Sequence, residues 1–437
     1  MKNVTKLICM LVVLALSLVM VSGCSGAQSD DDVTLTMTIG VPAEFLNGPD
    51  AETWKECMRY WQEDYATFAN TKISYTPIPT EEAAMKKFMK KVDRGQVSMF
   101  FSPRSELVDK MIAEETIISY DGIRLKYGGY KDDIPGGVLN ISEEDNLSNY
   151  MMPLVGTYQG LFINAKIFKD NEIAEPTDWA SLLDAIAKLQ EKNITPIAAG
   201  FADEGLEYMV DEMILSEGGT AEHSYQPTFG VMSSWERAVN SIKSLEQAGA
   251  FTPNCYKVSY ADAKQDFVDG KAAMIIAPST DLVPAINANQ VKAVSFPCSP
   301  TGKREQGAIL GDLNVGVYLS AEYFNNSNLR CSDGVMDLLD EEYLYNPDLI
   351  RTMMDEGAIC GVDKFYDANA DSTLEKSFGK LLSKATAGDR PMRANAYSMD
   401  TTVDAFRKAL TGGNVSEVLL QAANAEIAAK KAATEAK

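Results

Sequence analysis

Strand-like and helix-like segments alternate along the first quarter of this 437-residue chain, and this alternation restricts the fold more than any other feature. Apolar residues and threonines alternate strictly from Val33 to Ile39, as in a half-buried strand. Two further segments, 72–78 and 97–101, also have the character of strands. Between the three strands, apolar residues recur with helical spacing in 54–68 and 85–92. Such an order of elements predicts a parallel sheet covered by helices.

The pattern restarts in the middle of the chain. Strands are predicted at 158–164, 194–199 and 271–277, and Trp235 begins an apolar helical stripe between the last two. Thr177 is the expected N-cap of another helix in this region. Two α/β units predict two lobes, and ligands of open α/β sheets bind beyond the carboxyl ends of the strands. The loops that follow the strands are therefore the places to look for a site.

An export signal precedes the first strand. Fifteen mostly apolar residues, Leu7–Val21, follow Lys2 and Lys6, and the run is shorter than the roughly 20 residues of a membrane-spanning helix. The sequence Val21-Ser-Gly-Cys24 resembles a bacterial lipobox. That resemblance implies a lipoprotein signal peptide at 1–23, with diacylglycerol and palmitate at Cys24 holding the protein on the extracytoplasmic face of the cell membrane. An ordinary secretory signal with an incidental cysteine is the alternative.

The charge of the chain restricts its partners. Residues 24–32 are small, polar and acidic, and we expect them to form a disordered tether. The formal net charge of the whole chain is −22 at pH 7. A polyanion repels nucleic acid and anionic lipid headgroups, so nucleic acid is not expected as a partner. The membrane is expected to be contacted through the lipid anchor and not through charge.

Motifs for catalysis, metals and cofactors are absent from the sequence. The single histidine, His223, has polar neighbours and is expected to be a solvated loop residue. The segment 367–371 has the first three ligand positions of a calcium loop but lacks its glycine and glutamate, and we interpret it as a polar turn. The sequence therefore predicts no enzyme, no metal site and no cofactor.

The cysteines suggest no framework of disulfides. Outside the signal and the lipobox, five remain at wide spacing: Cys57, Cys255, Cys298, Cys331 and Cys360. We expect free, buried cysteines that behave as small hydrophobic residues. One or two disulfides are the alternative.

Several motifs occur in an order that is typical of one protein family. They are Gly160–Asn164, Lys166–Phe168, Pro176–Trp179 with Leu182 and Leu183, Lys192–Ile197, Phe267–Met274 and Asp312–Ser320. Together they resemble the family 1 extracellular solute-binding proteins, the maltose-binding-protein-like receptors of ABC importers. The resemblance implies an α/β fold of the type II periplasmic-binding-protein class, with a ligand cleft between two lobes that crossing strands join. It places the first lobe at 33–155 plus about 316–362, and the second at about 156–315 plus 363–437.

The resemblance also implies a function. A monomeric receptor would capture a small solute, a sugar or an oligosaccharide, by lobe closure and deliver it to the transmembrane subunits of an ABC permease. A tethered receptor has a higher effective concentration near its permease. Two alternatives are a sensor lipoprotein that reports ligand to a membrane kinase and a surface glycosidase.

The candidate ligand contacts follow strands or stand at the crossing between lobes. They are Glu44, Phe45, Ser102, Arg104, Tyr158, Phe201, Asp203, Ser279, Asp312, Asn314 and Tyr397, with Glu204, Tyr208 and Thr280 as neighbours. Aromatic faces stack on sugars and polar side chains bind their hydroxyls. For each candidate, a solvated loop, core packing or a backbone turn is the structural alternative. The four tryptophans are expected in the core, and the lack of one after Pro278 argues against a long maltodextrin-like ligand.

Overall fold

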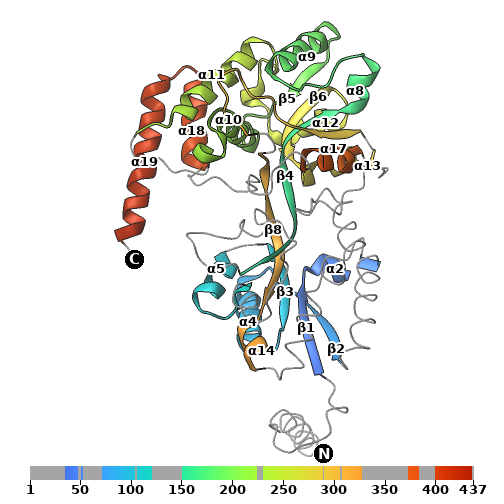
Figure 1. The fold of residues 1–437 in the computed structure, drawn as a ribbon, viewed down its shortest axis with the longest axis vertical. Coiled ribbons are helices and arrows are strands. Elements are labelled where there is room, and N and C mark those ends of the chain that lie inside the picture. The colour runs from blue at the N-terminus through green and yellow to red at the C-terminus, as the bar shows by residue number, and fades with distance from the viewer. Residues whose placement is uncertain are drawn as a thin grey trace, which may run out of the picture.

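The computed structural model shows a single sheet that runs through two groups of helices (Figure 1). Within the described residues the sheet has eight strands in the order β2-β1-β3-β8-β4-β6-β5, and β7 pairs with β4 outside this path. The structure describes residues 35–47, 51–52, 71–103, 106–120, 150–223, 230–288, 290–305, 308–326, 373–382 and 399–435.

The first group, here called the first lobe, holds three parallel strands. They are β1 (Leu35–Val41), β2 (Thr71–Pro77) and β3 (Met99–Pro103), which confirms the three strands predicted from apolar patterning. The described helices of this lobe are α2 (Ala43–Asn47), α4 (Glu82–Asp93), α5 (Glu106–Ala113) and α14 (Ala321–Asn326). Phe88, Met89 and Val92 of α4 are buried, and Phe88 packs edge-to-face on Phe100 of β3.

The second group, here called the second lobe, holds three short strands and most of the helices that the structure describes. Its strands are β5 (Thr195–Ala198), β6 (Ala272–Pro278) and β7 (Val291–Val294). Its α-helices are α8 (Ala165–Asp170), α9 (Trp179–Glu191), α10 (Glu204–His223), α11 (Ser233–Gln247), α12 (Tyr260–Val268), α13 (Val283–Asn287), α17 (Thr373–Leu382), α18 (Met399–Leu410) and α19 (Val415–Glu435). Two 3₁₀ segments are η2 (Cys255–Lys257), between α11 and α12, and η3 (Ser279–Leu282), directly after β6.

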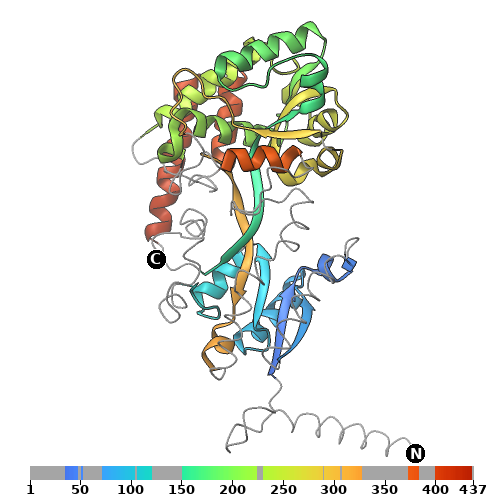
Figure 2. The same ribbon diagram turned by 45° about the vertical axis from the view of Figure 1, so that its right-hand side comes forward.

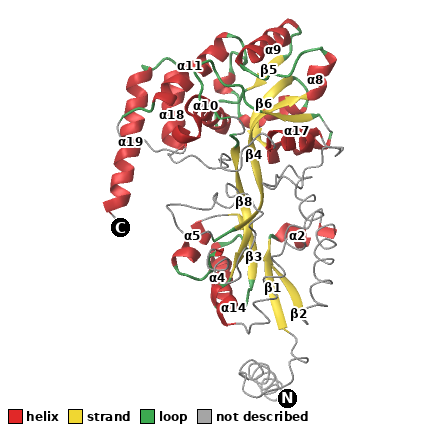
Figure 3. Ribbon diagram, viewed as in Figure 1, coloured by secondary structure: helices red, strands yellow, loops and turns green. Residues whose placement is uncertain are grey.

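Two long strands join the lobes. β4 (Met152–Asn164) and β8 (Leu310–Leu319) pair antiparallel and run from one lobe into the other (Figures 1 and 3). β4 starts six residues earlier than the predicted strand at 158–164, because its first half pairs with β8. The sheet is therefore mixed, and only its β1–β2, β1–β3 and β5–β6 pairs have the predicted parallel direction.

The start of α9 differs from the prediction by one residue. Asp178, not Thr177, is the N-cap, because the Asp178 carboxylate accepts the Ser181 N–H at 2.8 Å. The Ser181 hydroxyl in turn accepts the Asp178 N–H at 2.9 Å, which completes a capping box. The Ser181 N–H also lowers the pKa of the Asp178 carboxyl below its ordinary value.

Core positions agree with the apolar periodicity where they are described. Trp179 and Trp235 are buried, as predicted, whereas Trp54, Trp61 and the segment 367–371 lie outside the described residues. Cys255 is a free, buried cysteine, and Cys298 is free and partly exposed. The other cysteines lie outside the described residues. None of the described helices is long and apolar enough to cross a membrane.

Candidate functional site

Strand directions bring the carboxyl ends of both lobes' strands toward each other. β6 runs antiparallel to β4 and ends with Pro278 opposite Gln159, so it points back toward the first lobe, and β5 is parallel to it. β3 is antiparallel to β8 and therefore points toward the second lobe, together with β1 and β2. The loops after β1, β3, β5 and β6 thus share the region between the lobes (Figure 2).

The first lobe contributes three predicted positions to this region. Glu44 and Phe45 lie in α2, directly after β1, and their side chains are not among those described. Ser102 lies in β3, opposite Gly316 of β8, and is partly exposed. Arg104 lies outside the described residues. Backbone topology therefore places Glu44, Phe45 and Ser102 at the interlobe end of the first lobe.

The second lobe contributes polar groups after β5 and β6. Asp203 is exposed, and its Oδ1 accepts the backbone N–H of Tyr260 at 2.6 Å. Ser279 is fully buried, and its hydroxyl accepts the N–H of Tyr158 at 3.1 Å. The neighbouring Thr280 is exposed, and its hydroxyl lies 3.2 Å from that of Thr157 in β4. Of these residues, Asp203 and Thr280 present side chains to the surface.

Two predicted aromatic contacts lie in the core. The Tyr158 ring packs 5.4 Å from Phe162 and 5.2 Å from Phe378, and burial raises the pKa of its phenol. The Phe201 ring packs 5.2 Å from Phe251 and is 1% exposed. Tyr158 lies in the middle of β4 and Phe201 follows β5, and both side chains are buried among apolar residues.

The remaining predicted contacts are placed only by their backbone or not at all. Asp312 and Asn314 lie in β8, where Asp312 is opposite Thr157, and their side chains are outside those described. Tyr397 lies outside the described residues. The position of Asp312 and Asn314 on a crossing strand is that expected for residues between the lobes.

A tyrosine pair with nearby carboxylates forms the chemically richest part of this region. The partly exposed ring of Tyr208 packs edge-to-face on Tyr260 at 5.1 Å, and the Tyr260 hydroxyl donates to Asp281 Oδ2 at 2.9 Å. Burial raises the pKa of Tyr208 to about 12, and the charges of Asp281, Glu204, Glu207 and Asp203 add to the rise. We call Asp203, Tyr208, Thr280 and Asp281, together with the buried Tyr260 beneath them, the tyrosine–carboxylate surface. An aromatic face beside hydroxyls and carboxylates can hold a molecule that has both an apolar face and hydroxyl groups.

Sequence reasoning missed two members of this surface. Asp281 stands one residue beyond Thr280, in the loop that was singled out, and the position of that loop after β6 could have identified it. Tyr260 begins α12, and the elements α11 and η2 separate it in sequence from its neighbour Tyr208 in α10. No local pattern links the two residues.

Behind this region lies a buried polar network that the sequence did not predict. His223 is fully buried at the end of α10 and lies 2.7 Å from Asp211 on the same helix. The expectation of a solvated loop histidine is therefore wrong. Asp211 also accepts a hydrogen bond from Gln159 of β4 at 3.2 Å. A crossing strand is thereby tied to a helix of the second lobe.

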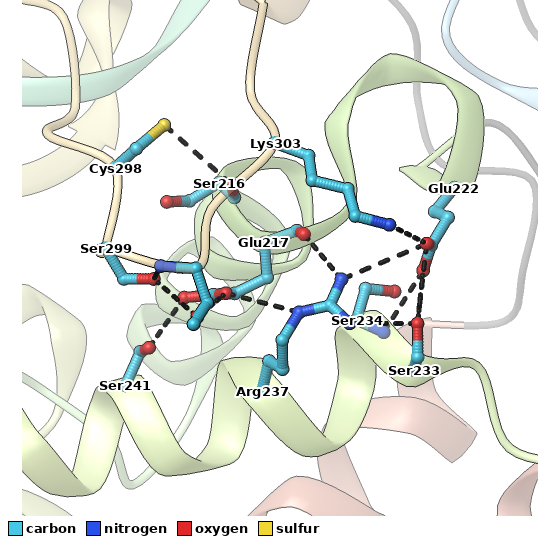
Figure 4. A network of polar contacts seen from close by, with 11 residues as sticks. Ser216, Glu217, Glu222, Ser233, Ser234, Arg237, Ser241, Cys298, Ser299 and Lys303 are labelled. Carbon is cyan, nitrogen blue, oxygen red and sulfur yellow. Dashed lines mark hydrogen bonds and ion pairs between the residues drawn. The ribbon is translucent and has the colours of Figure 1, made fainter.

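The network continues into the segment that leads to β8. Arg304 pairs with the fully buried Glu212 and donates to Ala308 O at 2.7 Å. Glu217, also fully buried, accepts the hydroxyls of Ser241 at 2.6 Å and Thr301 at 3.2 Å, as Figure 4 shows for Ser241. These contacts hold the approach to β8 against α10. Among the described residues, no three His, Cys, Asp or Glu side chains are grouped as a metal site.

Known proteins resemble this chain in sequence pattern and in fold. Residues 64–357 match the model of a family described as bacterial extracellular solute-binding protein. The chain has no match among curated proteins.

Solved structures of low sequence identity share the fold. A probable secreted solute-binding lipoprotein from Streptomyces coelicolor aligns with a TM-score of 0.68 at 14% identity, covering 91% of this chain and 99% of that one. RafE from Streptococcus pneumoniae, in its apo form, aligns with a TM-score of 0.62 at 15% identity, covering 92% and 99%. The maltotriose-binding protein of Thermus thermophilus, with maltotriose bound, gives 0.56 at 18% identity, covering 90% and 98%. These alignments confirm the predicted fold class.

Proposed function

Because this chain belongs to the bacterial extracellular solute-binding proteins, we propose that it is the receptor of an ABC importer and captures a sugar or oligosaccharide. It would bind the ligand by lobe closure, without catalysis, and deliver it to a membrane permease. The observation that carries this proposal is the tyrosine–carboxylate surface at the carboxyl ends of β5 and β6, facing the strand ends of the first lobe.

The chemistry of this surface suits a carbohydrate. The Tyr208 ring supplies an aromatic face, and Asp203, Thr280 and Asp281 supply groups that accept hydrogen bonds from hydroxyls. Similar solved structures include a protein bound to maltotriose and a chitin oligosaccharide binding protein. From the first lobe, Glu44, Phe45, Ser102 and Arg104 are proposed to contact the ligand, and Asp312, Asn314 and Tyr397 to complete the site.

Closure would take place about the two crossing strands. Ligand bound to both lobes stabilises a closed state over an open one, and the change is absorbed by a few residues at the crossing. We place the lobe boundaries at 33–155 plus about 316–362 and at about 156–315 plus 363–437. In support, both boundaries fall within the stretch where β4 and β8 pair, at Val155 and Val315, which lie opposite each other.

The membrane attachment is part of the proposal. Cleavage before Cys24 and lipidation of its sulfur would leave the receptor tethered outside the membrane, as a monomer beside its permease. The sequence Val21-Ser-Gly-Cys24 supports this step. Replacement of Cys24 by Ala should release the protein from membranes and leave its ligand affinity unchanged.

A thermal-shift screen of the purified lipoprotein against mono- and oligosaccharides tests the proposal. A ligand at 100 times its Kd stabilises the folded state by about 2.7 kcal/mol. Tyr208→Ala should weaken the response at least tenfold in apparent Kd, whereas Tyr208→Phe, which keeps the ring, should retain most of it. Asp281→Asn should weaken it as well, and Lys192→Gln on the exposed end of α9 is the control. No shift across a broad sugar panel would overturn the carbohydrate ligand.

A further inference from the structure

One surface of the first lobe is basic although the whole chain carries a net charge of −22. Helix α4 and the turn after it hold five cations and one carboxylate within residues 86–94. The cations, all exposed, are Lys86, Lys87, Lys90, Lys91 and Arg94. At 100° per residue they occupy one side of the helix, opposite the buried Phe88, Met89 and Val92. We call these five cations the basic stripe.

The end of the basic stripe lies beside the amino-terminal ends of β1 and β3. We call this end of the strands, where the chain enters the first lobe, the entry edge of the sheet. The turn after α4 is fixed by hydrogen bonds from Gln96 N to Lys91 O at 2.8 Å and from Ser98 N to Thr38 O at 2.8 Å. β3 starts beside Ile39, so Leu35 lies only four residues, roughly 13 Å, further toward the same edge. In Figure 1, α4 lies next to α14 and farther from the second lobe than α5 does.

The distance from the anchor to this edge is limited. Ten residues separate Cys24 from Leu35, and even fully extended they span at most about 40 Å. Lys72 adds a further exposed cation at the same edge, where it pairs with Thr36. The counter-charges at this edge include Asp93 in the last turn of α4, Glu322 of α14 beside Gly95, and the exposed Glu115, whose neighbour Thr116 accepts the N–H of Ala321. Asp30, Asp31 and Asp32 of the tether precede β1 in the sequence.

We propose that the basic stripe of α4 docks the first lobe on the anionic headgroups of the membrane that holds the lipid anchor. This inference rests on the proposed lipidation of Cys24. Each lysine or arginine near an anionic bilayer strengthens association by about fivefold, and the interaction acts only within about a Debye length. The net charge of the chain predicts repulsion from such a surface. The basic stripe reverses that prediction for the solvent-facing side of α4 alone, and the tether keeps this edge of the lobe near the bilayer.

Lysine acylation of the lipidated full-length protein in vesicles, read by mass spectrometry, tests the docking. The vesicles contain phosphatidylcholine alone or with 40% phosphatidylglycerol, at 50 or 500 mM KCl. We expect Lys72, Lys87, Lys90 and Lys91 to react at least threefold more slowly only with phosphatidylglycerol at 50 mM KCl. Lys169, Lys192 and Lys257, which are exposed in the second lobe, should react equally under all four conditions.

Two triple variants distinguish the effect of the basic stripe from the effect of the net charge of the chain. In the triple variant Lys87→Gln, Lys90→Gln, Lys91→Gln, the protection of Lys72 should disappear. The matched variant Lys169→Gln, Lys192→Gln, Lys257→Gln has the same net charge and should keep the protection of Lys72.

Equal reactivity of the α4 lysines in both lipids would overturn the proposal. Protection that appears only when a permease is added would also overturn it, since that indicates an acidic protein partner. Vesicle flotation at 500 mM KCl reports lipidation separately, and sugar binding by the triple variant reports the receptor function separately.

Discussion

Asp211 and His223 are both buried and lie 2.7 Å apart, although a break in α10 separates them. The break is at Gly219, whose φ of 68° is left-handed, so the last residues of the helix turn back toward its middle. Glu305 accepts the Thr220 N–H at 2.9 Å and holds this turn in place. The buried pair thus depends on a backbone conformation that glycine allows.

Replacement of His223 by Ala should destabilise the folded state by about 3 kcal/mol, because it removes a hydrogen-bonding partner from a buried carboxylate. Urea unfolding followed by circular dichroism measures this change. Lys192→Ala, at an exposed position, is the control and should change stability by less than about 0.5 kcal/mol. An equal, small effect of both substitutions would show that the Asp211–His223 contact contributes nothing.

Glu212 should make stability depend on pH. Burial raises the pKa of its carboxyl above the ordinary value of 4.5, although the charge of Arg304 opposes the rise. Between 4.5 and the raised pKa, the folded state keeps a proton that the unfolded chain has lost, so stability falls as pH rises through this window. Glu212→Gln cannot titrate and should lack this fall.

Unfolding free energies of the wild type and Glu212→Gln, measured from pH 4 to 8, test this sign. Glu191→Gln, at an exposed position, serves as the control. If the wild type gained stability relative to Glu212→Gln as the pH rose, attraction to Arg304 would outweigh desolvation.

Gly311 should not tolerate a side chain at the crossing of β4 and β8. Its φ is 147°, and a Cβ would lie 2.2 Å from the carbonyl oxygen of Thr157 on the paired strand. Gly412 also has a positive φ, 113°, but a Cβ there would meet nothing within 4 Å. Gly311→Ala should therefore lower the melting temperature clearly more than Gly412→Ala, because the first adds a clash with backbone to the conformational strain. A similar fall in melting temperature for both variants would show that the clash with the Thr157 carbonyl oxygen adds no cost in stability.

Cys255 should resist alkylation in the folded protein. Burial raises the pKa of its thiol to about 11, so at pH 8 only about one molecule in a thousand carries the reactive thiolate. Iodoacetamide labelling and peptide mass spectrometry should find Cys255 unmodified before unfolding and modified after it. The partly exposed Cys298 is the internal comparison and should react first. Rapid native labelling of Cys255 would contradict its burial.

The elements that depend on local pattern were predicted from the sequence. The alternation at Val33–Ile39 and the apolar run at 271–277 correspond to β1 and β6, because strand burial has a period that a short window reveals. The extra length of β4 was not predictable in this way. Its first residues are ordered by β8, which lies more than 150 residues later in the chain.

The sequence predicted which loops follow the strands of the second lobe, but not the direction of their side chains. The loops after β5 and β6 were singled out because ligands bind beyond strand ends, and these loops do face the first lobe. Whether an aromatic side chain in such a loop points outward depends on tertiary packing. Phe201 packs on Phe251, and Tyr208 remains partly exposed, although both follow the same strand.

The late arrival of β8 also affects how the chain can fold after export. β3 needs β8 to cover one of its edges, and Pro103 pairs with Val315, more than 200 residues later. The part of the second lobe from β4 to β7 is therefore made and exported before the first lobe can close its sheet, and α17, α18 and α19 follow later. Pairs so distant in sequence form slowly, and an uncovered strand edge invites pairing with other chains. The interval before β8 docks is thus the period in which this protein most needs protection from aggregation outside the cell.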